Sequence, residues 1–478
     1  MIGEYNKLST PAKAALWFTV CGIIQKGISF ITVPIFTRLL TTTQYGEVSV
    51  YNSWVGLLSI FCTLNLFLGG FNNGMMEYEG NRSQYVSAIQ GLITSISFFF
   101  LMVYLLAHDF WNRLLGIKTG LVLVMFMEIL TTAGLSLWSS RERYEFRYKK
   151  LVKITIINAV LPSFFSIIVI SLVDKSYGAE IKIVTNAIIT SIICACIYVS
   201  NFKKGKSYFN KDIWKVSFLF NLTLLPHYLS TMILNQADRI MISRMVGDSE
   251  AGIYSVAYSA AMILNVVVSA VNNSFAPWIY ERLKESNYKL IENTANILFI
   301  GAAMLLVMLI VFAPEVIIIL AGSKYESAVM IIPSVASSLY FIFMYQIFAN
   351  VEFYFKKNKF IAYASVVGGV LNVILNYFGI KWIGYMAAGY TTLICYVIFG
   401  IAHFYFMNRI CKTYLQGIKL FDSKIIFLTA FLLVFFAVSM TFLYKYAVVR
   451  YAILFIICIV VSCSRKKICK FLFQFKRM

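Results

Sequence analysis

Residues 37–53 read TRLLTTTQYGEVSVYNS, and residues 243–259 read SRMVGDSEAGIYSVAYS. Aligned at a constant separation of 206 residues, the two stretches share an arginine, a glycine, two serines and a valine. The chain therefore contains an internal duplication, and the two stretches mark the same place in each copy. The identical pairs are Arg38/Arg244, Gly46/Gly252, Ser49/Ser255, Val50/Val256 and Ser53/Ser259.

About fourteen apolar runs of near membrane-spanning length surround these stretches. The chain of 478 residues is 60% hydrophobic and only 13% charged, with a mean hydropathy of +0.77. A helix needs about 20 apolar residues to cross the hydrocarbon core of a bilayer. The runs predict an all-α polytopic membrane protein whose transmembrane helices lie near residues 14–37, 47–69, 85–107, 118–138, 152–173, 182–201, 215–242, 252–277, 291–313, 328–350, 360–380, 385–407, 424–444 and 447–463.

The gaps between these runs are alternately rich and poor in basic residues. With the amino terminus placed in the cytoplasm, the inner segments hold 30 of the 42 Lys and Arg residues and the outer loops hold 11. Basic residues are kept on the cytoplasmic side, so both termini are predicted to be cytoplasmic. Anionic inner-leaflet lipid then accounts for the net charge of +21, and no nucleic-acid partner is expected.

The duplication predicts the domain organisation. In each copy the quoted stretch joins the first span to the second, which indicates two six-helix lobes at residues 1–205 and 206–415. Both copies begin on the inner side, so they are parallel repeats about an axis along the membrane normal, as in many transporters. Residues 416–478 hold two further spans and a basic cytoplasmic tail. These spans either face lipid as a simple addition or form a groove for a lipid tail.

Lys26 lies near the middle of the first predicted span. A charge that faces lipid at that depth costs about 3 kcal/mol or more. We expect the polar stripe that holds Lys26 to face the protein interior or a water-filled cavity. At 100° per residue, the stripe consists of Thr19, Gly22, Lys26, Ser29 and Thr37, and it is widened by Gln25 and Thr32. The alternative is a structural lysine that reaches the headgroups or pairs with a carboxylate.

The seventh span is the counterpart of the first and carries a second polar stripe. Within it, His227 follows Pro226, which can open the backbone hydrogen bonding of a helix. His227 could titrate near neutral pH, although a satisfied hydrogen-bonding role is the alternative. The stripe consists of Thr223, His227, Thr231, Asn235 and Asp238.

Polar residues also cluster toward the outer end of the seventh span. Asn235, Gln236, Asp238 and Arg239 are candidates for contact with a substrate, and Asp238 is also a candidate for ion coupling. For Asp238 and Arg239, an ion pair near the headgroups is an equally good interpretation.

Three further charged residues are candidates for ion coupling or gating. Glu128 lies mid-span in the fourth helix, where it could neutralise Lys26, bind a coupling ion or simply hold helices together. Arg38 and Arg244 recur at outer helix ends in both repeats. Their long side chains can reach the headgroups, and a shared gating contact is the alternative.

Signatures of catalysis are missing from the chain. A phosphate-binding loop ending at Gly205-Lys206-Ser207 would need a glycine at position 200, which is Ser200. The three histidines do not have metal-ligand spacing, and no loop is long enough for a catalytic domain. The sequence therefore predicts transport rather than catalysis, with no cofactor and no metal.

Several motifs resemble those of the Wzx-like polysaccharide repeat-unit flippases in the multidrug/oligosaccharidyl-lipid/polysaccharide exporter superfamily. The resemblance is carried by the helix from Lys13 to Arg38, by Thr37-Arg38-Leu39-Leu40 with Tyr45-Gly46, by Asn235-Gln236-Ala237-Asp238-Arg239-Ile240-Met241-Ile242 followed by Gly252-Ile253-Tyr254-Ser255, and by Gly69-Gly70-Phe71-Asn72-Asn73-Gly74-Met75-Met76. The layout of six, six and two helices covers the whole chain. Glu77 departs from the family pattern, since many relatives carry a basic residue near this position.

The resemblance implies a flippase of the bacterial cytoplasmic membrane. Its substrate would be an undecaprenyl-pyrophosphate-linked polysaccharide repeat unit, such as an O-antigen or capsule unit, carried from the inner to the outer leaflet by alternating access. Membrane lipid, a polysaccharide polymerase and a chain-length regulator are the implied partners. Lys26 and Gln25 would contact the pyrophosphate and sugar head, with Asn235, Gln236 and Arg239 on the outer side. A cation-coupled multidrug antiporter of the same superfamily is the main alternative, and a membrane polysaccharide polymerase is a weaker one.

Overall fold

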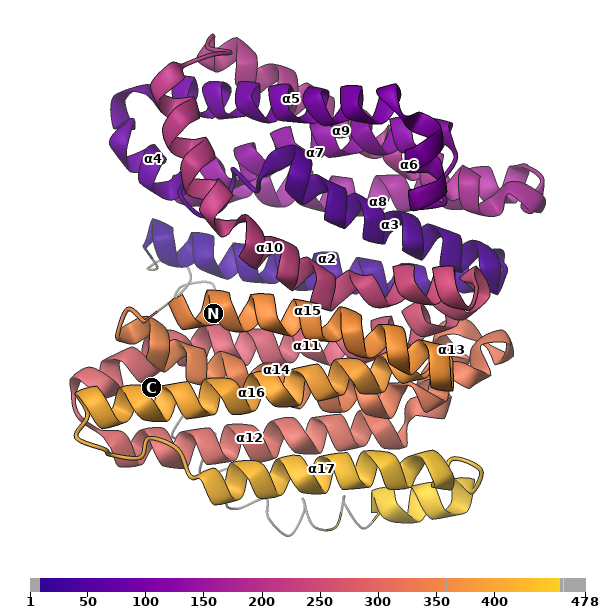
Figure 1. Ribbon diagram of the computed structural model, residues 1–478, viewed down its shortest axis with the longest axis vertical. Coiled ribbons are helices and arrows are strands. Elements are labelled where there is room, and N and C mark those ends of the chain that lie inside the picture. The colour runs from indigo at the N-terminus through magenta and orange to yellow at the C-terminus, as the bar shows by residue number, and fades with distance from the viewer. Residues whose placement is uncertain (1–8, 358, 456–458, 460–478) are drawn as a thin grey trace. The chain divides into compact units, whose positions relative to one another are not determined.

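The computed structural model describes residues 9–357, 359–455 and 459. All regular secondary structure within these ranges is helical, which confirms the predicted fold class (Figure 1). Twelve helices of the described chain are long and apolar enough to cross a membrane. They are α2 (Thr10–Leu39), α5 (Arg82–Leu106), α7 (Thr119–Tyr144), α8 (Tyr148–Leu172), α9 (Gly178–Gly205), α10 (Lys211–Met245), α11 (Asp248–Lys284), α12 (Tyr288–Val311), α14 (Ile332–Tyr354), α15 (Lys359–Ile383), α16 (Ala387–Tyr414) and α17 (Ser423–Leu443).

Two of the fourteen predicted spans need separate comment. The span predicted at 47–69 is the helix α3, Thr42–Thr63, which is less apolar than the twelve. It begins five residues earlier than predicted because Thr41 and Gln44 form a reciprocal capping box. It ends early because Leu64 and Asn65 adopt left-handed backbone conformations. The span predicted at 447–463 lies partly outside the described residues.

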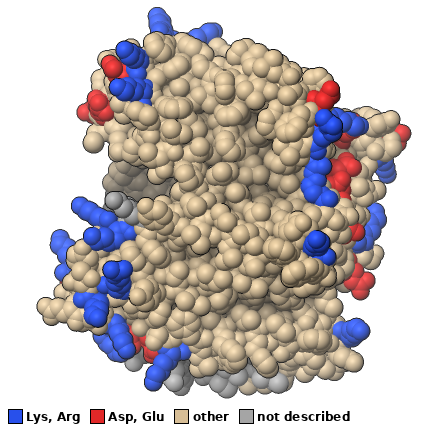
Figure 2. Space-filling model, viewed as in Figure 1, with Lys and Arg blue, Asp and Glu red and all other residues tan. Residues whose placement is uncertain are grey.

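Charged side chains on the face drawn in Figure 2 gather toward the helix ends. The middles of the helices on this face are covered by uncharged side chains. This distribution suits helices that cross a bilayer, because a charge in the hydrocarbon is costly while a charge at the interface is not.

The duplication extends well beyond the two quoted stretches. Between the end of α2 and the end of the short helix α6 (His108–Leu115), four helix boundaries recur at the same separation of 206 residues, although α11 continues through the positions at which α3 ends and α4 lies in the first copy. In the second copy, α6 corresponds to α13 (Ala313–Ala321), and both are followed by a glycine with positive φ, 64° at Gly116 and 74° at Gly322. The matching boundaries are Leu39/Met245, Thr42/Asp248, Arg82/Tyr288 and Leu115/Ala321.

Packing divides the chain into two compact units. The first comprises Met1–Ser259, Leu320–Lys324 and Asn358–Thr391, and the second comprises Ala260–Ile319, Tyr325–Lys357 and Thr392–Met478. In the first unit α10 packs against α15 and α3, α7 packs against α9, and α2 packs against α8. In the second unit α12, α14 and α17 pack together. The repeat boundaries at 1–205, 206–415 and 416–478 describe sequence copies rather than packing and stay predictions.

Candidate functional site

A buried polar network surrounds Asp238 in the first unit. The Asp238 side chain is fully buried, and its carboxylate accepts hydrogen bonds from the Tyr254 hydroxyl at 2.5 Å and from Asn376 Nδ2 at 2.6 Å. Asn376 also donates to Asn372 Oδ1 at 3.1 Å and accepts from the Thr391 hydroxyl. Burying a carboxylate is costly unless hydrogen bonds satisfy it. The hydrogen-bond network around the Asp238 carboxylate joins side chains from four helices, α10, α11, α15 and α16.

The sequence analysis identified Asp238 but missed its partners. Asn372 and Asn376 lie four residues apart in an otherwise apolar run, which places both on one face of α15. That spacing is the signal that could have found them. Their assembly with Asp238 and Thr391 brings carboxylate, amide and hydroxyl oxygens together, and such oxygens are the ligands that hard cations prefer.

Transition-metal binding has no support in the described part of the chain. No group of three or more His, Cys, Asp or Glu residues there is placed to hold a metal ion. The oxygen atoms of the Asp238 network are of the kind that binds a hard cation or a proton, and Asp238 contributes one formal negative charge.

Arg239 is buried beside this network and held by its own helix. Its guanidinium donates to the Asn235 carbonyl at 2.7 Å and to Gln236 Oε1 at 3.1 Å, and it lies 4.4 Å from the centre of the Tyr258 ring. Gln236 Oε1 also accepts from the hydroxyl of Ser53 at 3.1 Å, which connects α10 to α3. The predicted site residues Asn235, Gln236 and Arg239 thus lie together, and these hydrogen bonds fix the side chains of Gln236 and Arg239.

Lys26 and Gln25 lie elsewhere, on an exposed stretch of α2. Thr19 and Ser29 are exposed on the same helix, and their hydroxyls donate back to the carbonyls of Ala15 and Gln25 at 2.9 and 3.1 Å. The polar side chains of the predicted stripe are therefore exposed from Thr19 to Ser29, whereas Thr37, near the end of the same helix, is buried.

Glu128 meets a tyrosine in the structure. The Tyr51 hydroxyl of α3 donates to Glu128 Oε2 at 3.5 Å, and the Thr132 hydroxyl donates to the Glu128 carbonyl at 2.6 Å. Of the three roles that the sequence analysis left open for Glu128, the contact with Tyr51 favours joining helices α3 and α7.

His227 is half-buried on α10, next to Pro226 and close to the Tyr228 ring. Within the described residues its Nδ1 has no hydrogen-bond partner. The alternative to a titrating role was a histidine with satisfied hydrogen bonds, and the structure provides no hydrogen bond at Nδ1 among the residues that it describes.

Arg38 and Arg244 have different surroundings. Arg244 donates to the Leu114 carbonyl at 2.6 Å at the end of α6, which suits a cation at a helix C-terminus. Arg38 donates to the Pro34 carbonyl of its own helix at 2.8 Å. The residue before Arg38, Thr37, donates from its hydroxyl to the carbonyl of Leu320 at 2.7 Å. Leu320 is the counterpart of Leu114 in the second copy.

The segment Gly69-Met76 forms a turn and the short helix α4, Phe71–Glu77. With α10 it encloses a cavity of about 110 Å³ whose polar lining includes Asn73, Glu77 and Ser217. Glu77, which departs from the family pattern, thus faces a small cavity rather than the packed core.

Comparisons with known proteins identify the family. The polysaccharide biosynthesis protein family matches residues 12–279, more than half of the chain. The chain belongs to this family. One relative is a probable low-salt glycan biosynthesis flippase, Agl15, of Haloferax volcanii, which is 21% identical over 83% of this chain and 83% of its own length.

Solved structures identify the fold. The lipid II flippase MurJ in an inward closed conformation superposes with a TM-score of 0.69, at 13% identity, over 95% of this chain and 100% of MurJ. An inward-facing multidrug resistance MATE transporter of the MOP superfamily superposes with a TM-score of 0.61, at 13% identity, over 85% of this chain and 100% of its own. Together these findings assign the chain to the polysaccharide biosynthesis protein family and give it the fold shared by MurJ and the MATE transporter.

Proposed function

We propose that this protein carries undecaprenyl-pyrophosphate-linked polysaccharide repeat units from the inner to the outer leaflet of the bacterial cytoplasmic membrane. Both termini then lie in the cytoplasm, and a polysaccharide polymerase and a chain-length regulator receive the product. The observation that carries the proposal is Lys26, an exposed cation in the middle of an apolar helix, in a chain of the polysaccharide biosynthesis family.

The chemistry of this cargo matches the residues available. A sugar head and a pyrophosphate anion cannot cross hydrocarbon unaided, whereas the polyprenyl tail can stay in lipid. Lys26 attracts the pyrophosphate, and Arg239 assists on the outer side. Gln25, Asn235 and Gln236 offer amide groups to the sugars. The two repeats alternate between inward and outward access around this cargo.

A leaflet-accessibility assay in proteoliposomes tests the proposal. A labelled lipid-linked oligosaccharide starts in one leaflet, and its arrival in the other is read with a membrane-impermeant reagent. We expect Lys26→Ala to reduce transfer at least tenfold, and Lys26→Arg, which keeps the charge, to retain most of it. Unchanged transfer by Lys26→Ala would remove the lysine from the mechanism.

A cation-coupled multidrug antiporter is the second candidate, and the buried Asp238 carboxylate favours it. Its oxygen-rich network would bind a coupling cation or proton in either kind of transporter, so the substrate has to decide. We expect the lipid-linked sugar, and not a lipophilic cation, to be moved. We also expect Asp238→Asn to abolish the stimulation of transfer by an imposed ion gradient.

A further inference from the structure

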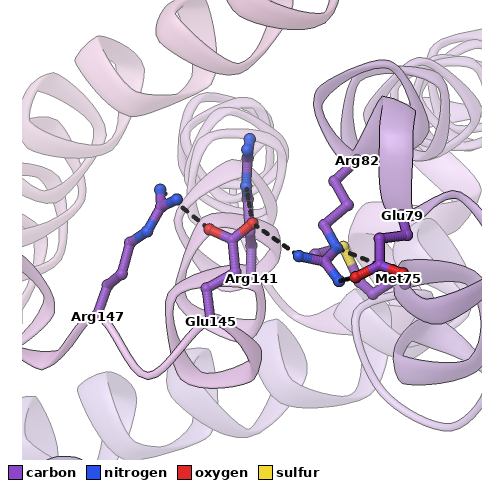
Figure 3. Close-up of polar contacts among 6 residues, drawn as sticks. All are labelled: Met75, Glu79, Arg82, Arg141, Glu145 and Arg147. Atoms are coloured by element: carbon purple, nitrogen blue, oxygen red, sulfur yellow. Dashed lines mark hydrogen bonds and ion pairs between the residues drawn. The ribbon is translucent and has the colours of Figure 1, made fainter. Parts of the chain in front are cut away.

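Three arginines converge on a single carboxylate at the ends of α5, α7 and α8 (Figure 3). Glu145, whose side chain is only 7% exposed, lies 3.0 Å from Arg147, 3.4 Å from Arg141 and 3.9 Å from Arg82. The charge pattern of the chain assigns this end of the helices to the cytoplasm.

Two of the three guanidiniums are fixed in place. Arg82 donates to the Met75 carbonyl at 3.0 Å, pairs with Glu79 at 3.3 Å and lies 5.1 Å from the centre of the Tyr144 ring. The Arg141 side chain is 17% exposed and bonds to Glu145. The two carboxylates of Glu145 and Glu79 cannot neutralise three guanidiniums, so the cluster keeps a net positive charge that water and ligands can reach.

Arg147 is the accessible member of the cluster. Its side chain is 60% exposed, and its ion pair with Glu145 occupies only part of its fork of five N–H donors. The chain turns sharply just before it, because Phe146 has a φ of 55° and the Arg147 amide donates back to the Glu142 carbonyl at 2.8 Å. This helix-ending turn directs the chain from α7 into α8.

Two hollows meet at Phe146 and Arg147. One has a volume of about 660 Å³ and is lined by Arg82, Arg143 and Arg147 together with Glu145. The other has a volume of about 490 Å³. Its charged lining consists of Glu142, Arg147, Lys149, Lys150 and Lys204. Each hollow is large enough for a lipid headgroup, and in each the basic side chains outnumber the acidic ones.

Aromatic side chains accompany these basic residues. Phe146 is 46% exposed between the hollows, and Trp138 lines the hollow of about 490 Å³. Tyr148 stacks on Trp17 of α2 with ring centres 6.3 Å apart. Such aromatic residues are enriched at the membrane interface, where lipid phosphates lie.

We propose that Arg82, Arg143 and Arg147, which line the hollow of about 660 Å³ beside Glu145, bind the phosphate group of an inner-leaflet lipid. Guanidinium forks match phosphate oxygens in pairs, and Glu145 holds the forks of Arg82 and Arg147 in place before the ligand arrives, which lowers the entropy cost of binding. Basic pockets between membrane helices on the cytoplasmic side recognise lipid headgroups in this way. The site is separate from Lys26 and does not depend on which cargo the protein carries.

The test measures binding by the purified full-length protein in a neutral detergent. The probes are short-chain phosphatidic acid, a fatty acid that has the charge but no phosphate, and inorganic phosphate. We expect phosphatidic acid to bind at least tenfold more tightly than either of the others. Equal binding of the fatty acid would show a non-specific charge effect, and equal binding of inorganic phosphate would show that no lipid is required; either result overturns the proposal.

Substitutions locate the binding. Arg147→Gln should weaken phosphatidic acid at least tenfold, and Arg147→Lys, which keeps the charge but loses the fork, should weaken it about threefold to fivefold. The matched control is Lys289→Gln, which removes a 73% exposed basic side chain from α12 and should change binding less than twofold. Equal effects of Arg147→Gln and Lys289→Gln would refute the assignment. If Arg147→Gln fails to fold, Arg143→Gln, which changes another lining residue of the same hollow, takes its place with an expected loss of about fivefold.

Discussion

Gly46 and Gly252, which occupy equivalent positions in the two repeats, face each other across the starts of α3 and α11. A Cβ atom built on Gly252 would lie 3.0 Å from the Gly46 nitrogen, and one built on Gly46 would lie 3.0 Å from the Gly252 nitrogen. The atoms nearest to each added Cβ are equivalent too, since the Cβ on Gly46 meets the carbonyl oxygen of Asp248 and the Cβ on Gly252 meets that of Thr42. Such a reciprocal contact requires a local two-fold axis between the copies.

Replacing either glycine by alanine should destabilise the protein. The added methyl group would overlap a backbone carbonyl that cannot move independently of its helix, and overpacking of this kind costs about 1–3 kcal/mol. Thermal unfolding of Gly46→Ala and Gly252→Ala in detergent measures the effect.

Gly301→Ala is the matched control. Gly301 is also helical, in α12, but a Cβ there would meet nothing within 4 Å. Removing a flexible residue from a helix should stabilise the protein by about 0.5–1 kcal/mol. If all three variants shifted the unfolding temperature alike, the close contact between the repeats would not be the cause.

The same contact shows what a single sequence can and cannot reveal. The equivalence of Gly46 and Gly252 was visible as a repeated residue, and the helical class follows from the apolar runs, whereas the parallel orientation of the copies stays a prediction. The contact between the two glycines was not visible in the sequence, because a duplication shows only that two residues are equivalent. Helix boundaries depended on local chemistry, as at α3, where a capping box and a left-handed turn moved both ends.

The same distinction applies to the site residues, some of which were identified from the sequence and some of which were missed. Asp238 and Lys26 were identified because a charge in an apolar run is conspicuous wherever it lies. Asn376 was missed because its importance depends on contact with Asp238, 138 residues away along the chain, and Thr391 was missed because it contacts Asn376. Neutral polar residues are common in membrane helices, so only the folded arrangement distinguishes these two from the rest.

The buried pair of His403 and Glu352 should be important for the stability of the second unit. His403 Nδ1 lies 2.8 Å from Glu352 Oε1, and both side chains are fully buried. Removing one partner leaves the other without its hydrogen bond, and for buried ionisable pairs this costs about 3–5 kcal/mol. Glu352→Ala and His403→Ala should each lower the unfolding temperature strongly.

The double variant tests whether the two residues act as a pair. Glu352→Ala/His403→Ala should be much less destabilised than the sum of the single variants, because no polar group is then left unmatched. Additive effects would show that each side chain contributes through packing alone.

The contact between Glu315 of α13 and Arg450 predicts a pH dependence. Arg450 Nη1 lies 2.9 Å from both carboxylate oxygens, and the Tyr451 hydroxyl donates at 2.8 Å. Partial burial raises the pKa of Glu315, but the hydrogen bonds from Arg450 and Tyr451 outweigh this effect and lower the pKa below the ordinary value of 4.5.

Since the folded-state pKa is the lower one, the contact stabilises the fold above pH 4.5 and loses this effect as the pH falls through the folded-state pKa. The difference in unfolding temperature between wild type and Glu315→Gln should therefore be constant near neutral pH and shrink toward zero in acid. A difference that stays constant into acid would mean that the charge of Glu315 is not what stabilises the contact.

Transport by alternating access predicts that the contact between the repeats opens during each cycle. The hydroxyls of Thr42 and Ser249, 2.9 Å apart, lie beside the two glycines and offer a place to lock it. In Thr42→Cys/Ser249→Cys, we expect oxidation to form a disulfide, confirmed by mass spectrometry, and to reduce lipid transfer at least tenfold. Reduction should restore transfer, and each single cysteine variant should be insensitive to the oxidant. Full transfer by the cross-linked protein would mean that the repeats exchange access without separating here, so the motion would have to take place elsewhere in the bundle.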